Sequence, residues 1–223
     1  MKTPIIAIDG PAASGKGTLS KALAKHLDFA HLDTGALYRA VAYTVLERGG
    51  DPADHQEAIE AAEFLRDYFA SQILEKPELR HDDTGQAASK VASVPKVREA
   101  LLQLQRNFAQ NPPKPCKGAV LDGRDIGTVI CPDAPLKLFI TAKTEIRAQR
   151  RLKELQSKDL QRGGVSVTYE AVLKDMQERD ARDAGRKAAP MKPADDAVII
   201  DSSDLTAEQM LEKAIKIAND RLS

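Results

Sequence analysis

Residues 9–18 read DGPAASGKGT, and this stretch is the most informative feature of the chain. It follows the apolar run Pro4-Ile5-Ile6-Ala7-Ile8, which is typical of a buried strand, and it leads into a segment with helical spacing. A strand, a glycine-rich turn with a lysine and then a helix form the layout of a phosphate-binding loop. The stretch therefore predicts that the chain binds a nucleoside triphosphate.

Each residue type in this loop suits phosphate binding. Glycines leave room for backbone N–H groups to point at phosphate oxygens, and the dipole of the following helix adds positive potential. Lys16 brings a compact charge to the β and γ oxygens, and the Thr18 hydroxyl can reach a phosphate oxygen or the magnesium shell. Gly17 separates Lys16 from Thr18, so the pattern is the variant GxxxxGKGT. We expect the loop to comprise Gly10, Pro11, Ala12, Ala13, Ser14, Gly15, Lys16, Gly17 and Thr18.

Composition excludes several classes of protein. Lys plus Arg and Asp plus Glu number 33 each, which argues against a nucleic-acid-binding coat. Cys116 and Cys131 form no close-spaced pair, so metal binding by thiols and redox chemistry lack support. The first residues resemble neither a signal peptide nor a membrane span, and we expect a cytoplasmic protein that binds no membrane. Residues 143–192 hold 13 basic and eight acidic side chains, so phosphates could gather there.

Aliphatic runs alternate with helical patterns along the chain. This alternation predicts an α/β fold, with a parallel sheet between two layers of helices and with ligands beyond the carboxyl ends of the strands. Residues 71–87 lack clear periodicity, and the polar stretch 157–165 is typical of a mobile flap. The expected strands are 4–8, 29–32, 118–121, 136–141 and 197–200. The expected helices are 15–26, 34–48, 56–69, 88–109 with a break near Pro95, 144–155, 168–182 and 206–221.

Three charged clusters stand out, two of them directly after predicted strands and the third after the expected flap. DTGALYR, residues 33–39, begins where the second strand ends, and its Arg39 could meet a second phosphate. DGRD, residues 122–125, ends the third strand, where phosphate-loop enzymes place an acidic residue near magnesium. A third cluster holds Arg179, Arg182, Asp183 and Arg186. One charged cluster is usually a solvated helix face, but three in a chain with a phosphate loop favour a second phosphate site.

The chain resembles the bacterial-type cytidylate kinases. The motifs GPAASGKGT, LDTGALYR, ASKVASVPKVREAL, DGRDIGTVICPDAP and ERDARDAGRKAAP stand in that family's order and span nearly its whole length. The resemblance implies a phosphate-loop nucleoside monophosphate kinase in one domain, residues 1–223. Its parts would be a CORE at about 1–55, 89–155 and 167–223, a monophosphate-binding insert at about 56–88, and a lid at about 156–166.

The resemblance also implies the reaction and its binding residues. ATP with Mg²⁺ would phosphorylate CMP or dCMP, giving ADP and CDP or dCDP. The nine residues expected to bind CMP are Thr34, Arg39, Ser89, Arg98, Arg124, Asp125, Arg179, Asp183 and Arg186. Among them Arg39, Arg124 and Arg186 would hold the phosphate, Arg179 and Asp183 the ribose, and Ser89, Arg98 and Asp125 the cytosine. Cytosine presents an amino donor beside ring acceptors, which suit a carboxylate and a guanidinium, respectively.

No general base is needed, because the attacking phosphate oxygen is already ionised at neutral pH. Positioning and charge neutralisation would supply the catalysis. Thr18 and Asp122 are the expected magnesium residues, and a monomer is the expected state. The residues expected to offset charge are Lys16, Arg124, Arg186 and the lid arginines Arg147, Arg150 and Arg151.

The chain departs from longer family members between about residues 69 and 87. Those members carry a small three-stranded sheet there, whereas residues 71–84 are too few and lack a hairpin turn signal, so we expect a reduced or partly irregular insert. Three other readings stay open. A shikimate-type kinase would have no use for the base-reading trio, and a nucleotide switch needs an NKxD-type motif, which this chain lacks. An ATP-binding structural protein would leave the arginine clusters unexplained.

Overall fold

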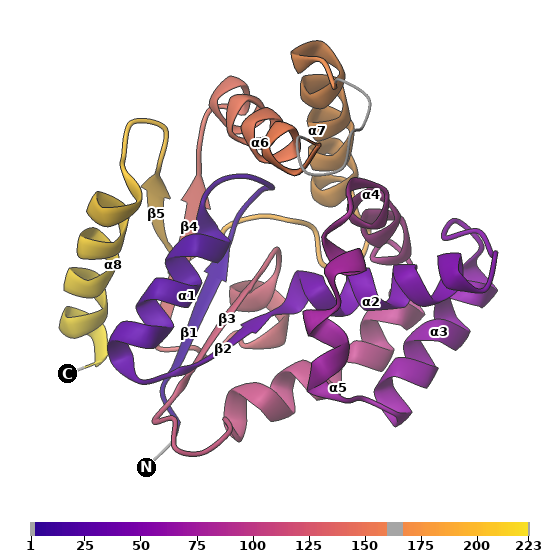
Figure 1. The fold of residues 1–223 in the computed structure, drawn as a ribbon. Helices are drawn as coiled ribbons and strands as arrows, with labels where there is room; N and C mark the ends of the chain where they lie inside the picture. The colour runs from indigo at the N-terminus through magenta and orange to yellow at the C-terminus, as the bar shows by residue number, and fades with distance from the viewer. Residues whose placement is uncertain (1–2, 160–166, 223) are drawn as a thin grey trace.

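A five-stranded parallel sheet in the order β2-β3-β1-β4-β5 forms the centre of the molecule (Figure 1). The structure is a computed structural model, and it describes residues 3–159 and 167–222. Strand β1 lies between β3 and β4, so the loop after β1 leaves the middle of the sheet at its carboxyl edge. The strands are β1 (Ile5–Asp9), β2 (Ala30–Asp33), β3 (Ala119–Gly123), β4 (Leu136–Thr141) and β5 (Val198–Asp201).

Helices cover both faces of this sheet, as the sequence predicts. Successive strand residues point to opposite faces. Ile6 and Ile8 accordingly pack with residues of α1 and α8, whereas Ala7 packs with residues of α2, α3 and α5. The three-layer α/β/α prediction is confirmed. The helices are α1 (Lys16–Leu27), α2 (Thr34–Glu47), α3 (His55–Asp67), α4 (Asp82–Val91), α5 (Pro95–Gln110), α6 (Thr144–Asp159), α7 (Tyr169–Ala184) and α8 (Ala207–Leu222).

Helices α6 and α7 lie over the carboxyl end of the sheet (Figure 1). They share the buried side chains of Ala148, Val172 and Met176, against which Ala12 and Ala13 of the β1–α1 loop are packed. None of the described helices is long and apolar enough to cross a membrane.

The strand register gathers polar groups at the carboxyl edge of the sheet. Asp33 of β2 pairs in register with Asp122 of β3, and Asp9 of β1 pairs with Gly123. Because the strands are parallel, the turns that follow all of them leave from this one edge. The phosphate loop after β1, DTGALYR after β2 and DGRD after β3 therefore meet at this edge.

Two sequence-based boundaries are wrong. Helix α4 begins at Asp82, inside the stretch expected to be aperiodic. The prediction missed this start because the first turn of the helix holds only Asp, Thr and Gly and so gives no apolar signal. Helix α6 runs to Asp159, beyond the expected start of the flap. Its charged last turns carry no Gly or Pro to end it. The rest of the expected flap and lid, residues 160–166, lies outside the described residues.

The shortened segment before α4 consists of two 3₁₀ helices, η1 (Ser71–Glu75) and η2 (Pro77–Arg80). Leu79 anchors them, since its side chain is buried in the core beside α2. The structure describes every residue from 56 to 88, and none of them lies in a strand. The division into CORE, insert and lid stays a prediction.

Candidate active site

The loop between β1 and α1 is shaped by two glycines with positive φ. Gly10 has φ 147°, and a Cβ there would lie 2.0 Å from the carbonyl oxygen of Ile140. Gly15, which precedes the first turn of α1, has φ 88°. A Cβ on Gly17 would meet no protein atom within 4 Å. Gly10 is therefore required by the close approach of β4, a contact that the local sequence does not reveal.

Lys16 lies at the start of α1, and its Nζ donates to the carbonyl oxygen of Pro11 at 3.3 Å. Burial, followed by repulsion from Arg124, lowers the pKa of the Lys16 ammonium to about 7, although Asp122 and Asp33 oppose this change. An incoming polyphosphate would favour the charged form again. Thr18 is exposed in the first turn of the helix.

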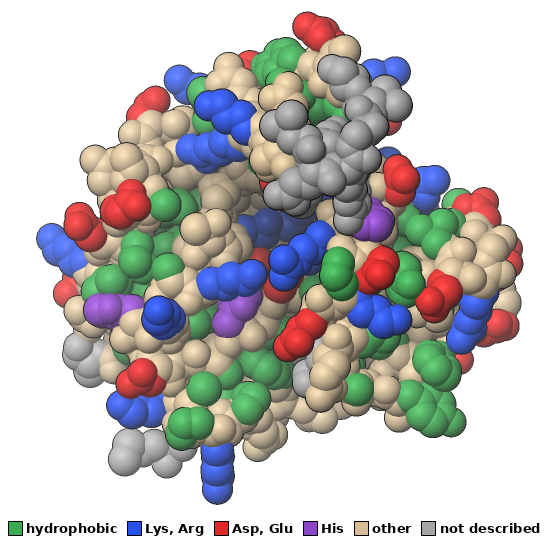
Figure 2. Space-filling view, in the orientation of Figure 1, with side chains coloured by type: hydrophobic (Ala, Val, Ile, Leu, Met, Phe, Trp, Pro, Cys, Tyr) green, Lys and Arg blue, Asp and Glu red, His purple; other side chains and the backbone are tan. Residues whose placement is uncertain are grey.

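One cavity brings together all nine residues predicted to bind CMP, with Lys16 and Asp122 beside them. They come from α2, α4, α5, the turn after β3, and α7 with the loop that follows it. Figure 2 shows Lys and Arg side chains gathered in a hollow near the centre of one face. Six cationic and four acidic side chains line this cavity, a balance that favours an anionic ligand.

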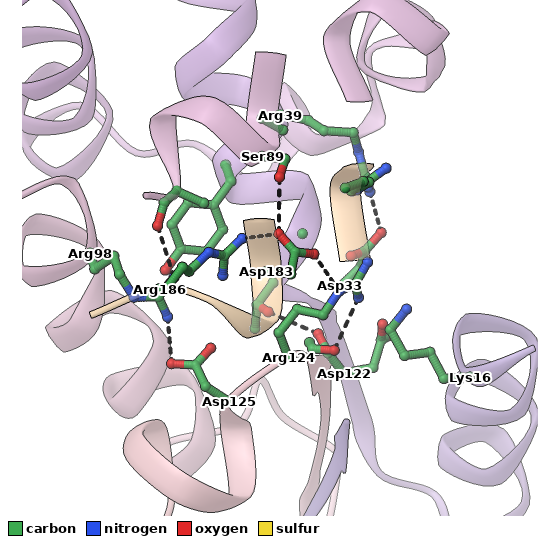
Figure 3. Close-up of a pocket in the computed structure, with 17 residues that line it drawn as sticks. Lys16, Asp33, Arg39, Ser89, Arg98, Asp122, Arg124, Asp125, Asp183 and Arg186 are labelled. Atoms are coloured by element: carbon green, nitrogen blue, oxygen red, sulfur yellow. Dashed lines mark hydrogen bonds and ion pairs between the residues drawn. The ribbon is translucent and has the colours of Figure 1, made fainter. Parts of the chain in front are cut away.

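Asp183 of α7 lies at the centre of the charge network (Figure 3). Its Oδ1 accepts from the Ser89 hydroxyl at 2.9 Å and from Arg186, and its Oδ2 accepts from Arg124 Nε at 3.1 Å. Burial would raise the pKa of this carboxyl, but the three arginines Arg124, Arg186 and Arg179 hold it below the ordinary value. Asp183 thus stays ionised and fixes the directions of two guanidinium groups.

A second buried pair joins Arg98 of α5 to Asp125 in the turn after β3. Arg98 also donates to the carbonyl oxygen of Ala92 at 3.3 Å, and its guanidinium lies 5.3 Å from the centre of the Tyr38 ring. Ser89 lines the same cavity, so the predicted base-reading trio is brought together. Arg39 pairs with Asp33 at the opposite wall, and Asp33 also caps α2 by accepting from Ala36 N.

Sequence reasoning missed the role of Asp9. Its carboxylate accepts the backbone N–H groups of Ile126 and Gly127 at 2.8 Å each, and it thereby holds the π-helix η3 (Ile126–Ile130) directly after DGRD. Burial raises the pKa of Asp9 to about 7 against the effect of these two bonds. An acidic residue at the end of an apolar strand was the available signal. This signal indicates that the Asp9 carboxylate needs hydrogen-bond donors, but it does not say which residues supply them.

His31 was also missed. Its Nε2 lies 2.7 Å from Oδ2 of Asp122, across neighbouring strands. Only the strand order β2-β3 makes the two residues neighbours, and the sequence does not give that order.

The three arginines expected in the lid have different surroundings. Arg147 is buried against Ala142, Ala12, Thr144 and Asp180, and Arg150 donates twice to Ser202. Arg151 pairs with Glu154 and lines a small cavity with Ala12 and Arg179. Arg151 therefore shares a cavity with Arg179, a cation of the main site.

The chemistry of Thr18 and Asp122 fits magnesium. Mg²⁺ is usually held by one or two protein oxygens together with substrate phosphates and water, and a hydroxyl and a carboxylate beside a phosphate loop form such a set. In the described part of the chain, no group of three or more His, Cys, Asp or Glu side chains could hold a metal without such help. The residues present therefore suit a metal that arrives with its nucleotide.

Comparison with known proteins identifies the family. The cytidylate kinase family model matches residues 6–220. The chain belongs to the cytidylate kinase family. The cytidylate kinase of Rhodospirillum rubrum is 55% identical over 213 residues, which are 96% of each chain. That of Paramagnetospirillum magneticum is likewise 55% identical over 213 residues, again 96% of each chain.

A more distant structure supports the fold alone. An uncharacterised protein from Eubacterium ventriosum aligns with 99% of this chain and 100% of its own at a TM-score of 0.54 and 18% identity. Membership in the cytidylate kinase family makes the protein a nucleotide-binding phosphotransferase, and the activity of the family is phosphorylation of CMP by ATP. Kinases of this kind typically use Mg-ATP. The alternatives of a nucleotide switch and a non-enzymatic ATP-binding protein are thereby set aside.

Proposed function

We propose that the chain transfers the γ-phosphoryl group of ATP to CMP and dCMP, with ATP on the loop at residues 10–18 and the acceptor in the cavity around Asp183. The observation that carries this proposal is the single cavity in which all nine predicted acceptor residues meet Lys16. Two buried donors support an anionic ligand there, because Arg179 Nε and Arg186 Nε have no hydrogen-bond partner among the described residues.

Arg39, Arg124 and Arg186 would bind the CMP phosphate, each able to offer two N–H groups to it. Arg179 and Asp183 would bind the ribose. Ser89, Arg98 and Asp125 would read cytosine, with the Asp125 carboxylate accepting from its amino group. Uracil places a carbonyl against that carboxylate, so the cavity disfavours UMP.

Catalysis would come from alignment and charge neutralisation. Lys16, Arg124 and Arg186, which line the same cavity, would offset charge on the transferring group, and Arg151, which shares a smaller cavity with Arg179, would join them. Arg150 would join them only by leaving Ser202. Thr18 and Asp122 would hold magnesium, which neutralises charge on the transferring group when bound. We also propose a cytoplasmic monomer, an insert at about 56–88, and a lid at about 156–166 that excludes water when it closes.

A substrate panel tests this function. Purified protein with ATP and Mg²⁺ is assayed for ADP formation against CMP, dCMP, UMP, AMP and GMP. The expected result is the highest kcat/KM with CMP or dCMP. Faster conversion of AMP, GMP or UMP would contradict the assignment of the base-reading trio.

A further inference from the structure

Two carbonyl groups of the phosphate loop accept hydrogen bonds from distant parts of the chain. A loop that turns its N–H groups toward phosphate turns carbonyl oxygens away from it, and buried carbonyls need partners. The Ala12 oxygen accepts from Arg147 NH1 at 3.3 Å. The Ser14 oxygen accepts from the Ser202 hydroxyl at 2.8 Å. Both donors lie more than 130 positions further along the chain.

Arg147 of α6 has partners on all three guanidinium nitrogens. Nε donates to the Ala142 oxygen at 3.0 Å, NH2 donates to Thr144 Oγ1 at 2.9 Å, and NH2 also forms an ion pair with Asp180 Oδ2 of α7 at 2.7 Å. The side chain is only 5% exposed. Its geometry therefore suits a fixed contact to the loop better than a mobile contact to a nucleotide.

Arg150, one turn of α6 further on, reaches the loop through Ser202. Its NH1 donates to the Ser202 hydroxyl at 3.0 Å, and its NH2 donates to the Ser202 carbonyl oxygen at 2.6 Å. Ser202 is 1% exposed and directly follows β5, where its N–H bonds the Thr141 oxygen at 2.8 Å. The Ser202 hydroxyl thus accepts from Arg150 and donates to Ser14, so the hydrogen of this hydroxyl is directed at the loop.

We propose that Arg147, Arg150 and Ser202 are positioning residues, which brace the phosphate loop from its outer side and preset its N–H groups for ATP. This inference rests on the proposed binding of ATP at residues 10–18. For Arg150, the proposed role changes: instead of contacting the transferring phosphoryl group, this side chain would hold Ser202. Preset dipoles cost no reorganisation on binding, so losing the brace weakens ATP affinity more than it slows the chemical step.

The first test compares Ser202→Ala with Ser203→Ala. Ser203 is a matched control in the same turn, because its hydroxyl accepts from Lys143 N and donates to Asp201 but, in the part of the chain that the structure describes, makes no hydrogen bond to the loop. Ser202→Ala is expected to raise the Kd and KM for ATP roughly 5- to 10-fold, the size of one or two hydrogen bonds. The KM for CMP should stay at the wild-type value. Equal ATP affinities for the two variants would overturn the brace.

The second test uses Arg150→Met and reads kcat against KM. A brace predicts a higher KM for ATP with kcat within about threefold of wild type, whereas direct stabilisation of the transferring group predicts a kcat loss of roughly 10²- to 10³-fold. The second outcome overturns the proposal for Arg150. If Ser202→Ala fails to fold, Arg150→Met still gives this readout.

The control for the proposed function is separate. Wild type and Ser203→Ala must bind ATP, and Lys16→Met must lose turnover. If these conditions fail, ATP binding at the loop is wrong. If they hold while both brace variants behave like wild type, only the brace is wrong.

Discussion

The donor loop and the acceptor cavity differ in whether backbone groups or side chains supply their positive charge. In the proposed function, the loop would present backbone N–H groups from one run of nine residues together with a single lysine, and two glycines with positive φ help to shape it. The cavity uses side chains from α2, α4, α5, α7 and the turn after β3, and most of its arginines are already paired with aspartates. A local motif can specify the first, whereas only the complete fold assembles the second.

This difference has an energetic consequence. Backbone dipoles in the loop cannot be removed by a side-chain substitution, so Lys16 is the one large charge there that mutation can delete. In the cavity, Asp183 pairs with two arginines and Asp125 with one, and changing one member leaves another buried charge without its partner. Variants on the donor side should therefore change turnover without lowering thermal stability. Variants on the acceptor side should change CMP binding and thermal stability together.

The largest effect is expected from Lys16→Met. Removing this ammonium should lower kcat by roughly 10³-fold, because no other group of the loop brings a full charge to the transferring phosphate. Thermal stability without nucleotide should not fall, since the ammonium is desolvated and repelled by Arg124. Steady-state kinetics and thermal melts check both parts. Retained turnover would remove Lys16 from the mechanism.

Asp125→Asn should have the next largest effect, on base selection. An amide can donate as well as accept, so the preference for CMP over UMP in kcat/KM should fall by about 10²-fold, while the KM for ATP stays constant. Asp133→Asn, an exposed site in the same connection to β4, is the matched control and should change neither value. Equal loss of ATP and CMP affinity would show that Asp125 serves the fold and not the base.

Arg124→Lys should have a smaller effect. The lysine keeps a charge beside Asp183 but loses the two-pronged geometry that phosphate favours, so the KM for CMP should rise roughly 30-fold. Arg106→Lys is the control, because among the described residues Arg106 donates to the carbonyl oxygens of Val129 and Ile130 and does not line the cavity. It should lower the melting temperature without changing the KM for CMP. A similar rise in KM for both variants would show that general loosening explains the effect.

The same contrast explains how much the sequence could predict. Glycine, lysine and threonine at fixed spacing identify the loop because its function depends on neighbours in the chain. The nine acceptor residues came from resemblance to a family, and the cavity brings them together. Neither source indicated that Asp9 would hold Ile126 and Gly127, or that Ser202 would reach Ser14, because those pairs depend on strand order. Helix α4 was placed late because its first turn lacks apolar side chains.

The smallest effect concerns the pH dependence of ATP binding. The pKa of Lys16 is lowered to about 7 in the free protein, so the ammonium loses its proton as the pH rises through that value. Phosphate oxygens favour the charged form and raise this pKa in the complex, so binding takes up a proton above pH 7. ATP affinity should therefore weaken by about fivefold between pH 7 and pH 8, the change that a single group titrating near 7 produces. Calorimetric titrations in two buffers of different ionisation enthalpy measure both the affinity and the proton uptake.

Lys16→Met controls for the titration of ATP itself, and its ATP affinity should lack the extra pH dependence that Lys16 contributes. If wild type and Lys16→Met show the same pH dependence, the lysine keeps its proton throughout, and the donor side carries a permanent charge like the arginines of the acceptor side.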